Sequence, residues 1–140
     1  MPKAARIFVI TISILNALAG LICGALFLIS PDGSLMGFQP LLPVVGTLPL
    51  ADVFFRDLTW IGIAMLLALG IPNAVATVML LRRVSGQYAV TLVAGVLLIL
   101  WTGFELIFMF NVAAVAYSVV GVLSIVCSAM LLRQTVPAGA

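Results

Sequence analysis

Four long apolar runs, which together cover most of this chain, constrain its fold more than any other feature. They span residues 7–29, 58–81, 88–110 and 113–132. A helix needs about 20 mostly apolar residues to cross the hydrocarbon core of a bilayer. Membrane-spanning strands are shorter and alternate apolar with polar side chains, which these runs do not do. The sequence therefore predicts an all-α polytopic membrane protein, with four transmembrane helices in an antiparallel bundle.

Composition favours the same class. Of the 140 residues, 65% are hydrophobic and 7% are charged, whereas soluble domains carry about 25% charged residues. The length suits a single transmembrane domain over residues 1–140. The net charge is only +2, so we expect no basic surface and no nucleic-acid partner. The expected surroundings are a lipid bilayer.

The basic residues indicate an orientation. Cytoplasmic segments of membrane proteins are enriched in Lys and Arg. If the chain crosses four times, five basic residues beside the ends of the runs fall on one side of the membrane. We therefore expect a multi-pass protein of the bacterial inner (plasma) membrane with both termini in the cytoplasm. The five residues are Lys3, Arg6, Arg82, Arg83 and Arg133.

Residues 30–57 form a long connection on the opposite, outer side. The segment begins with SPDGS, a strong turn signal. Pro40, Pro43 and Pro49 exclude a long regular helix. We expect a cap over the outer end of the helices, which either lies in the interface or dips into the membrane as a re-entrant element. Long loops in small domains are often functional.

Three charged residues close this outer segment. Asp52 and Arg56 have the i, i+4 spacing of a surface ion pair. Asp57 is a candidate N-cap for the second helix because its carboxylate can accept a backbone N–H. We expect this cluster to be mainly structural.

Each run also carries one face of small and polar residues. Helices in lipid associate through such faces, because lipid offers no hydrophobic drive between helices. The Gly20-x-x-x-Gly24 motif allows another backbone to approach closely, either within the chain or in a homodimer. Asn16 and Asn73 fall at about the same depth for a rise of ~1.5 Å per residue, so they could hydrogen-bond to each other. The residues expected at helix contacts are Asn16, Gly20, Gly24, Asn73 and Gly121.

One acidic residue interrupts the third run. In LILWTGFELIFMF, Glu105 lies roughly 9 Å from the outer end of the run. Three surroundings are open: a neutral carboxylic acid, an ion pair with Arg56, or a hydrated pocket near Thr102, Asn111 and Tyr117. An acid inside a membrane is a functional candidate, so these five are the predicted ligand- or proton-binding residues. The alternative is that Glu105 joins helices through hydrogen bonds to Thr102 and Tyr117.

The sequence shows no catalytic or metal motif. It contains no His, and so lacks the commonest general base and the usual zinc or haem ligand. Cys23 and Cys127 show no CxxC or metal-ligand spacing. Their depths, about 9 and 20 Å below the outer end, argue against a disulfide. We expect no catalytic residue, no metal and no cofactor.

Three stretches carry a resemblance to known proteins. They are SPDGSLMG, LPLADVFFRDLTWIGIAMLLALGIPNAVA and AGVLLILWTGFELIF. They resemble small uncharacterised four-helix bacterial inner-membrane proteins of the domain-of-unknown-function type. The resemblance covers most of the chain, implies a four-helix membrane fold and brings no catalytic residue. In size the chain is also similar to small multidrug-resistance transporters, but those place their essential Glu in the first helix, where this sequence has none.

Three functions are compatible with these features. The first is a structural or accessory subunit without catalysis, in a homodimer or a larger membrane complex. The second is an ion-coupled transporter or ligand-binding protein that takes an apolar or cationic small molecule into an outward-facing cavity at Glu105. The third is a lipid-modifying membrane enzyme. A cavity that reaches Glu105 favours the second, whereas a dry seam and an exposed small-residue face favour the first.

Overall fold

The computed structural model describes residues 2–137, and every regular element in that range is a helix. Four helices are long and apolar enough to cross a membrane, as expected of a multi-pass membrane protein. They are α1 (Pro2–Ile29), the second helix (Thr59–Arg82), α6 (Gln87–Phe108) and α7 (Val112–Thr135). The prediction of four helices long and apolar enough to span a membrane is confirmed.

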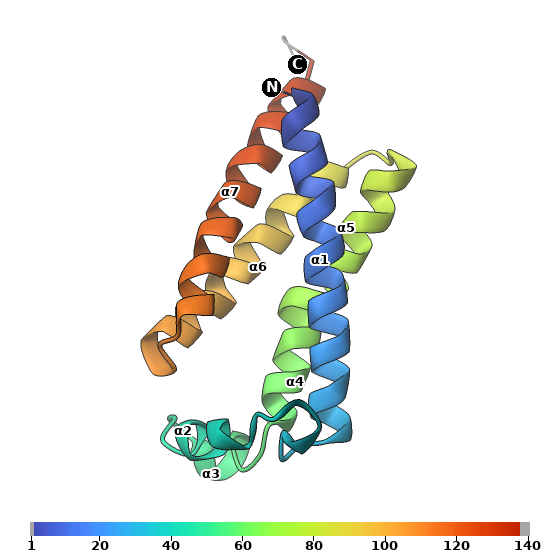
Figure 1. The fold of residues 1–140 in the computed structure, drawn as a ribbon. Coiled ribbons are helices and arrows are strands. Elements are labelled where there is room, and N and C mark those ends of the chain that lie inside the picture. The colour runs from blue at the N-terminus through green and yellow to red at the C-terminus, as the bar shows by residue number, and fades with distance from the viewer. Residues whose placement is uncertain (1, 138–140) are drawn as a thin grey trace.

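The helices lie in two groups along the long axis of the molecule (Figure 1). α1 contacts both parts of the second helix, α4 (Thr59–Met65) and α5 (Ile71–Arg82). α6 packs along α7, and further contacts join α5 to α6 and α1 to α7. The start of α1 and the end of α7 both lie at the top of Figure 1, and the 30–57 connection lies at the bottom. We refer to these as the terminal end and the cap end.

The second helix is interrupted between α4 and α5. Residues Leu66–Gly70 form a short π-helix, η3, in which each turn is wider than in an α-helix. Pro72 follows it and has no N–H to offer the carbonyl of Ala68. A wide turn before a proline is a recognised way to accommodate the missing bond, and π-helical turns bend helices.

The two buried asparagines do not make the predicted pair. Asn73 Nδ2 donates instead to the carbonyl of Leu69, one turn earlier in its own helix, at 2.8 Å. Leu69 lies in the wide turn of η3, which precedes Asn73, and its carbonyl is within reach of the Asn73 amide. Asn16 is buried on α1 with 3% of its surface exposed.

Glycine pairs bring α1 against the second helix. A Cβ atom built on Gly70 would lie 2.9 Å from the nitrogen of Leu21 and 3.0 Å from the carbonyl carbon of Gly20. A Cβ atom on Gly24 would lie 3.0 Å from the carbonyl oxygen of Gly62. The Gly20-x-x-x-Gly24 face is therefore covered inside the chain, so it is not free to form the homodimer contact that the motif also allowed.

The contact between α6 and α7 also uses small residues. A Cβ atom on Gly121 would lie 2.7 Å from Cδ1 of Ile99, and one on Gly95 would lie 2.9 Å from Cγ1 of Ile125. Each glycine thus receives an isoleucine of the facing helix. These close approaches hold α6 and α7 together along their length.

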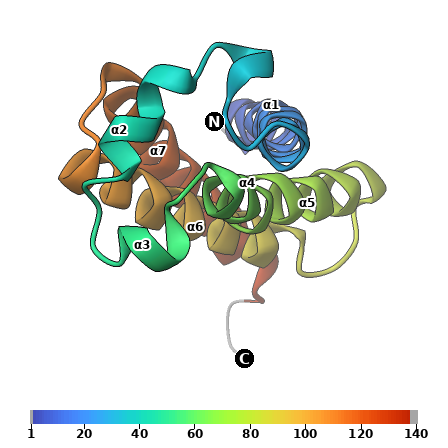
Figure 2. The same ribbon diagram turned by 90° about the horizontal axis from the view of Figure 1, so that it is seen from below.

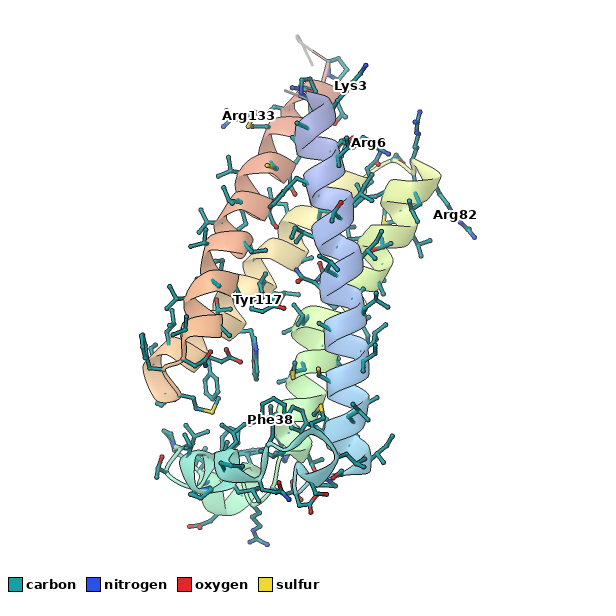
Figure 3. The ribbon with its side chains drawn as sticks, viewed as in Figure 1. Lys3, Arg6, Phe38, Arg82, Tyr117 and Arg133 are labelled. Atoms are coloured by element: carbon teal, nitrogen blue, oxygen red, sulfur yellow. The ribbon has the colours of Figure 1, made fainter. Side chains whose placement is uncertain are left out.

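Arg6 joins three segments at the terminal end (Figure 3). Its guanidinium donates to the carbonyl of Leu80 at 2.7 Å, to Oε1 of Gln87 at 3.0 Å and to the hydroxyl of Tyr88 at 2.6 Å. Leu80 lies near the end of α5, and the other two residues begin α6. Sequence reasoning used Arg6 only as an orientation signal and missed this contact.

The 30–57 segment, here called the cap, folds into short helical turns. It crosses from the end of α1 toward α6 and α7 and returns to α4 (Figure 2). Val45 and Leu48 of the cap are buried against Phe27, Ile61 and Met109, so the cap is packed onto the helices. Its elements are η1 (Ser34–Met36), η2 (Gln39–Leu41), α2 (Leu42–Val45) and α3 (Ala51–Phe54).

The charged residues that close the cap differ from expectation in detail. Arg56 Nε donates to the main-chain carbonyl of Asp52, so the contact shown between these residues runs through the backbone rather than the carboxylate. α4 begins one residue later than expected, with Leu58 at the N-cap position. The carboxylate of Asp57 still accepts the N–H of Thr59, at 2.9 Å.

Candidate functional site

A cavity of about 690 Å³ lies at the cap end, between the cap and the spanning helices. Its volume falls within the roughly 300–1,000 Å³ that is common for small-molecule sites. Its walls come from α1, the cap, α4 with η3, α6, the 109–111 connection and α7. The cavity therefore draws its walls from all four long helices and the cap, but from no residue of α5.

Aromatic side chains form much of the wall. Phe27 of α1 and Phe38 of the cap lie with ring centroids 5.6 Å apart. On α6, Trp101 and Phe108 line the cavity. Both pack on the ring of Phe104, at 5.8 and 5.1 Å between centroids, and Phe104 supports the wall without lining it. Phe55, at the end of α3, stacks on Phe104 from the cap side at 6.3 Å. Such rings offer a large apolar contact surface to a bound molecule.

Glu105 is the only acidic residue in the lining of this cavity. α6 ends at Phe108 and not at residue 110, so Glu105 lies in the last turn of the helix. The structure therefore places Glu105 about 4.5 Å from the helix end, closer than the roughly 9 Å estimated from the longer apolar run. Its side chain is half-buried.

Only one of the polar neighbours expected for Glu105, Asn111, lies beside its carboxyl group. The polar side chains beside this carboxyl group include those of Trp101 and Asn111. The hydroxyl of Thr102 donates to the carbonyl of Ile99 in its own helix, at 3.3 Å. This backbone bond engages Thr102, which was expected to bond to Glu105. Trp101 is the neighbour that the sequence-based hypothesis did not include.

Asn111 owes its position to the start of α7. Its side-chain oxygen accepts the N–H of Ala114 at 2.7 Å, which makes it the N-cap of the helix. Its Nδ2 atom donates to the carbonyl of Met109 at 2.9 Å. An asparagine just before a long apolar run is a recognised helix-start signal, so this role could have been read from the sequence. The N-cap role of Asn111 also explains why α6 ends earlier than predicted.

Four of the five predicted ligand- or proton-binding residues line the cavity. Glu105, Thr102 and Asn111 enter it with Tyr117 of α7. Arg56 does not line it, because its side chain bonds to the backbone of the cap. That this group binds a ligand or a proton stays a prediction.

Sequence reasoning missed Trp101, Phe38 and Cys23 as cavity residues. Trp101 lies one turn before Glu105 on the same helix, so the i, i+4 rule would have found it. The other two come from distant segments. Cys23 and Cys127 are both free.

No metal site accompanies the cavity in the part of the chain that the structure describes. Among residues 2–137, no three His, Cys, Asp or Glu side chains gather closely enough to hold an ion. The chemistry available to the site is therefore that of one carboxyl group, an amide, an indole, a phenol, a hydroxyl, a thiol and an apolar wall.

Comparison with protein-family models, curated proteins and solved structures finds no match to this chain. The function must therefore be inferred from the geometry of the cavity.

Proposed function

We propose that this chain is a ligand-binding membrane protein that holds a small apolar molecule with a cationic or hydrogen-donating end in the cap-end cavity. The observation that carries the proposal is the cavity of about 690 Å³ that reaches Glu105. The apolar part of the ligand lies against the aromatic wall, and the polar end binds the carboxyl group.

The charge of the lining supports this ligand class. Glu105 has no Lys or Arg beside it among the lining residues. A carboxylate that is partly withdrawn from water is costly without a positive or hydrogen-donating partner. An amine at the end of an apolar ligand would supply that partner, whereas a carboxylate ligand would be repelled.

The same features argue against an accessory subunit as the main role. The small-residue face of α1 at Gly20 and Gly24 is covered by the second helix. It is therefore not a free surface for a partner helix. The inner space at the cap end is also too large for a close-packed, dry seam.

We place the chain in a bacterial inner membrane as an antiparallel four-helix bundle, with both termini in the cytoplasm and the cavity facing outward. Lys3, Arg6, Arg82 and Arg133 lie at the terminal end of the molecule (Figure 3). The cap carries Asp32, Asp52 and Asp57 at the opposite end. Basic residues on one side favour a cytoplasmic location for that side.

Trp101 provides a reporter inside the cavity. The chain has two tryptophans, and Trp60→Phe leaves Trp101 as the only one. In nanodiscs, a brominated dodecylamine that enters the cavity should quench Trp101 fluorescence in a saturable way. A brominated dodecanol of the same length should bind more weakly, because it brings no positive charge to Glu105.

Glu105→Gln separates the two parts of the proposal. We expect it to weaken the binding of the amine about tenfold, the loss of one charged hydrogen bond, and to leave the alcohol unchanged. Asp52→Asn is the matched control, since Asp52 does not line the cavity. Equal binding of the amine by the parent and by Glu105→Gln would overturn the role of Glu105. Absence of saturable quenching would overturn the proposed function.

A further inference from the structure

A second hollow, of about 250 Å³, lies between α1 and α7. The helices contribute three residues each, and Leu15 on its α1 side is 55% exposed. Both helices are long and apolar enough to span a membrane, so in a bilayer this hollow would face lipid. The residues that line it are Ile12, Leu15, Asn16, Ala116, Tyr117 and Val120.

Tyr117 lines both this hollow and the large cavity. Its side chain lies in the space between α7 and α1 (Figure 3), and it is 38% exposed. One aromatic ring thus borders both spaces.

The residues of α7 next to Tyr117 are small. Ala113 lines the large cavity, and Ala116 lines the hollow. Neither side chain extends beyond its Cβ atom, so the ring of Tyr117 is the one large side chain of this stretch of α7 that lines both spaces. A change in its rotamer alone would widen the passage between them, and exposed side chains change rotamer rapidly.

We propose that the cavity is filled from the lipid, through the hollow between α1 and α7, with Tyr117 as the side chain that separates the two. The inference rests on the proposed function and narrows its ligand to a single-chain amphiphile that is dissolved in the membrane. Because it lines both spaces, Tyr117 meets the polar end of that molecule before Glu105 does. Its chain stays in apolar surroundings throughout.

The test measures the rate at which the ligand enters. Protein carrying Trp60→Phe is placed in nanodiscs and mixed with vesicles that contain brominated dodecylamine. Ala116→Phe puts a ring into the hollow at an exposed position, where it does not disturb the packed interior. We expect Ala116→Phe to slow the quenching of Trp101 about tenfold at an unchanged final amplitude. Tyr117→Ala should accelerate it.

Val119→Phe is the matched control. Val119 is on the same helix, is 56% exposed and lines neither space, so its ring should leave the rate as in the parent. A second measurement uses the parent alone. If entry is from lipid, the rate follows the mole fraction of amine in the bilayer and not its concentration in water.

The outcomes distinguish the two proposals. Saturable quenching whose rate is the same in Ala116→Phe, Val119→Phe and the parent would disprove entry between α1 and α7 and leave ligand binding intact. A rate that follows the concentration of amine in water would also disprove entry between α1 and α7 and leave ligand binding intact. It would indicate entry beneath the cap. A parent that shows no saturable quenching would overturn both proposals.

Discussion

Gly24 and Gly62 bring the backbones of α1 and α4 into contact: a Cβ atom built on Gly62 would lie 2.9 Å from the carbonyl oxygen of Gly24. The same atom would lie 2.9 Å from Cβ of Phe27, which lines the cavity. Neither neighbour is the free end of a flexible side chain. The contact between α1 and α4 and the cavity wall at Phe27 therefore both depend on the absence of a side chain at Gly62.

We expect Gly62→Ala to lower the free energy of unfolding by about 1–3 kcal/mol, because overpacking forces the two helices apart. Gly103→Ala is the control, since a Cβ atom there meets nothing within 4 Å. Thermal unfolding in detergent, followed by circular dichroism, measures the difference. Equal stability of the two variants would show that α1 and α4 are not in close contact at Gly62.

Arg6 should stabilise the terminal end through its three hydrogen bonds. Hydrogen bonds to a charged group contribute about 1.5–3 kcal/mol, so Arg6→Ala should lower the free energy of unfolding by about that amount. Arg6→Lys should recover only part of it, because one ammonium group cannot match the fork of a guanidinium. Lys3→Ala, at an exposed position nearby, serves as the control in the same denaturation assay. A loss as large for Lys3→Ala as for Arg6→Ala would refute the specific contact.

Asn111 should be needed for the start of α7. Asn111→Ala removes the acceptor for the N–H of Ala114, and loss of such a cap costs about 0.5–2 kcal/mol. Asn111→Ser should retain most of the stability, because serine is also a good N-cap. Hydrogen exchange at Ala114, which should quicken in the alanine variant and not in the serine variant, localises the effect. Equal exchange in both variants would mean that the N-cap side chain of residue 111 does not stabilise the first turn of α7.

Asp32 should titrate at unusually low pH. Hydrogen bonds from the hydroxyl of Ser30, the N–H of Ser34 and its hydroxyl hold the pKa of Asp32 below its ordinary value. Because the pKa is lower in the folded than in the unfolded chain, the ionised carboxylate stabilises the turn above the ordinary value of about 3.9. This contribution is lost as the pH falls through the folded pKa.

The carboxyl carbon resonance of Asp32 reports this titration directly. Its midpoint should lie below the ordinary aspartate value in the parent and move upward in Ser30→Ala, which removes the largest of the three effects. A midpoint that does not move in Ser30→Ala would show that the serine hydroxyl does not stabilise the ionised form.

Local pattern predicted the spanning helices well and their ends less well. Apolar length placed the end of α1 at Ile29, as observed, but α1 begins at Pro2, five residues earlier than predicted, and α7 (Val112–Thr135) ends three residues later than predicted. The end of α6 was misplaced by two residues, because apolarity continues through Phe110 although Asn111 already caps the next helix. The depth of Glu105 was overestimated for that reason.

The candidate site was recognised through its carboxylate and not through its shape. Glu105 stood out because an acid inside an apolar run is costly and therefore rare. Trp101 could also have been recognised from the sequence, because it lies one helical turn before Glu105. Phe38 of the cap and Cys23 of α1 were not, because only the folded chain brings these segments beside α6.

The amino-acid sequence by itself determined that the chain is helical and has four segments able to cross a membrane. A bilayer core offers no water to backbone polar groups, so long apolar segments must satisfy their hydrogen bonds as helices. Only the tertiary structure decided that Gly20 and Gly24 face the second helix, that the amide of Asn73 bonds within its own helix and that a cavity opens beside Glu105. These outcomes depend on contacts between residues far apart in the chain, and no local pattern specifies which surfaces will meet.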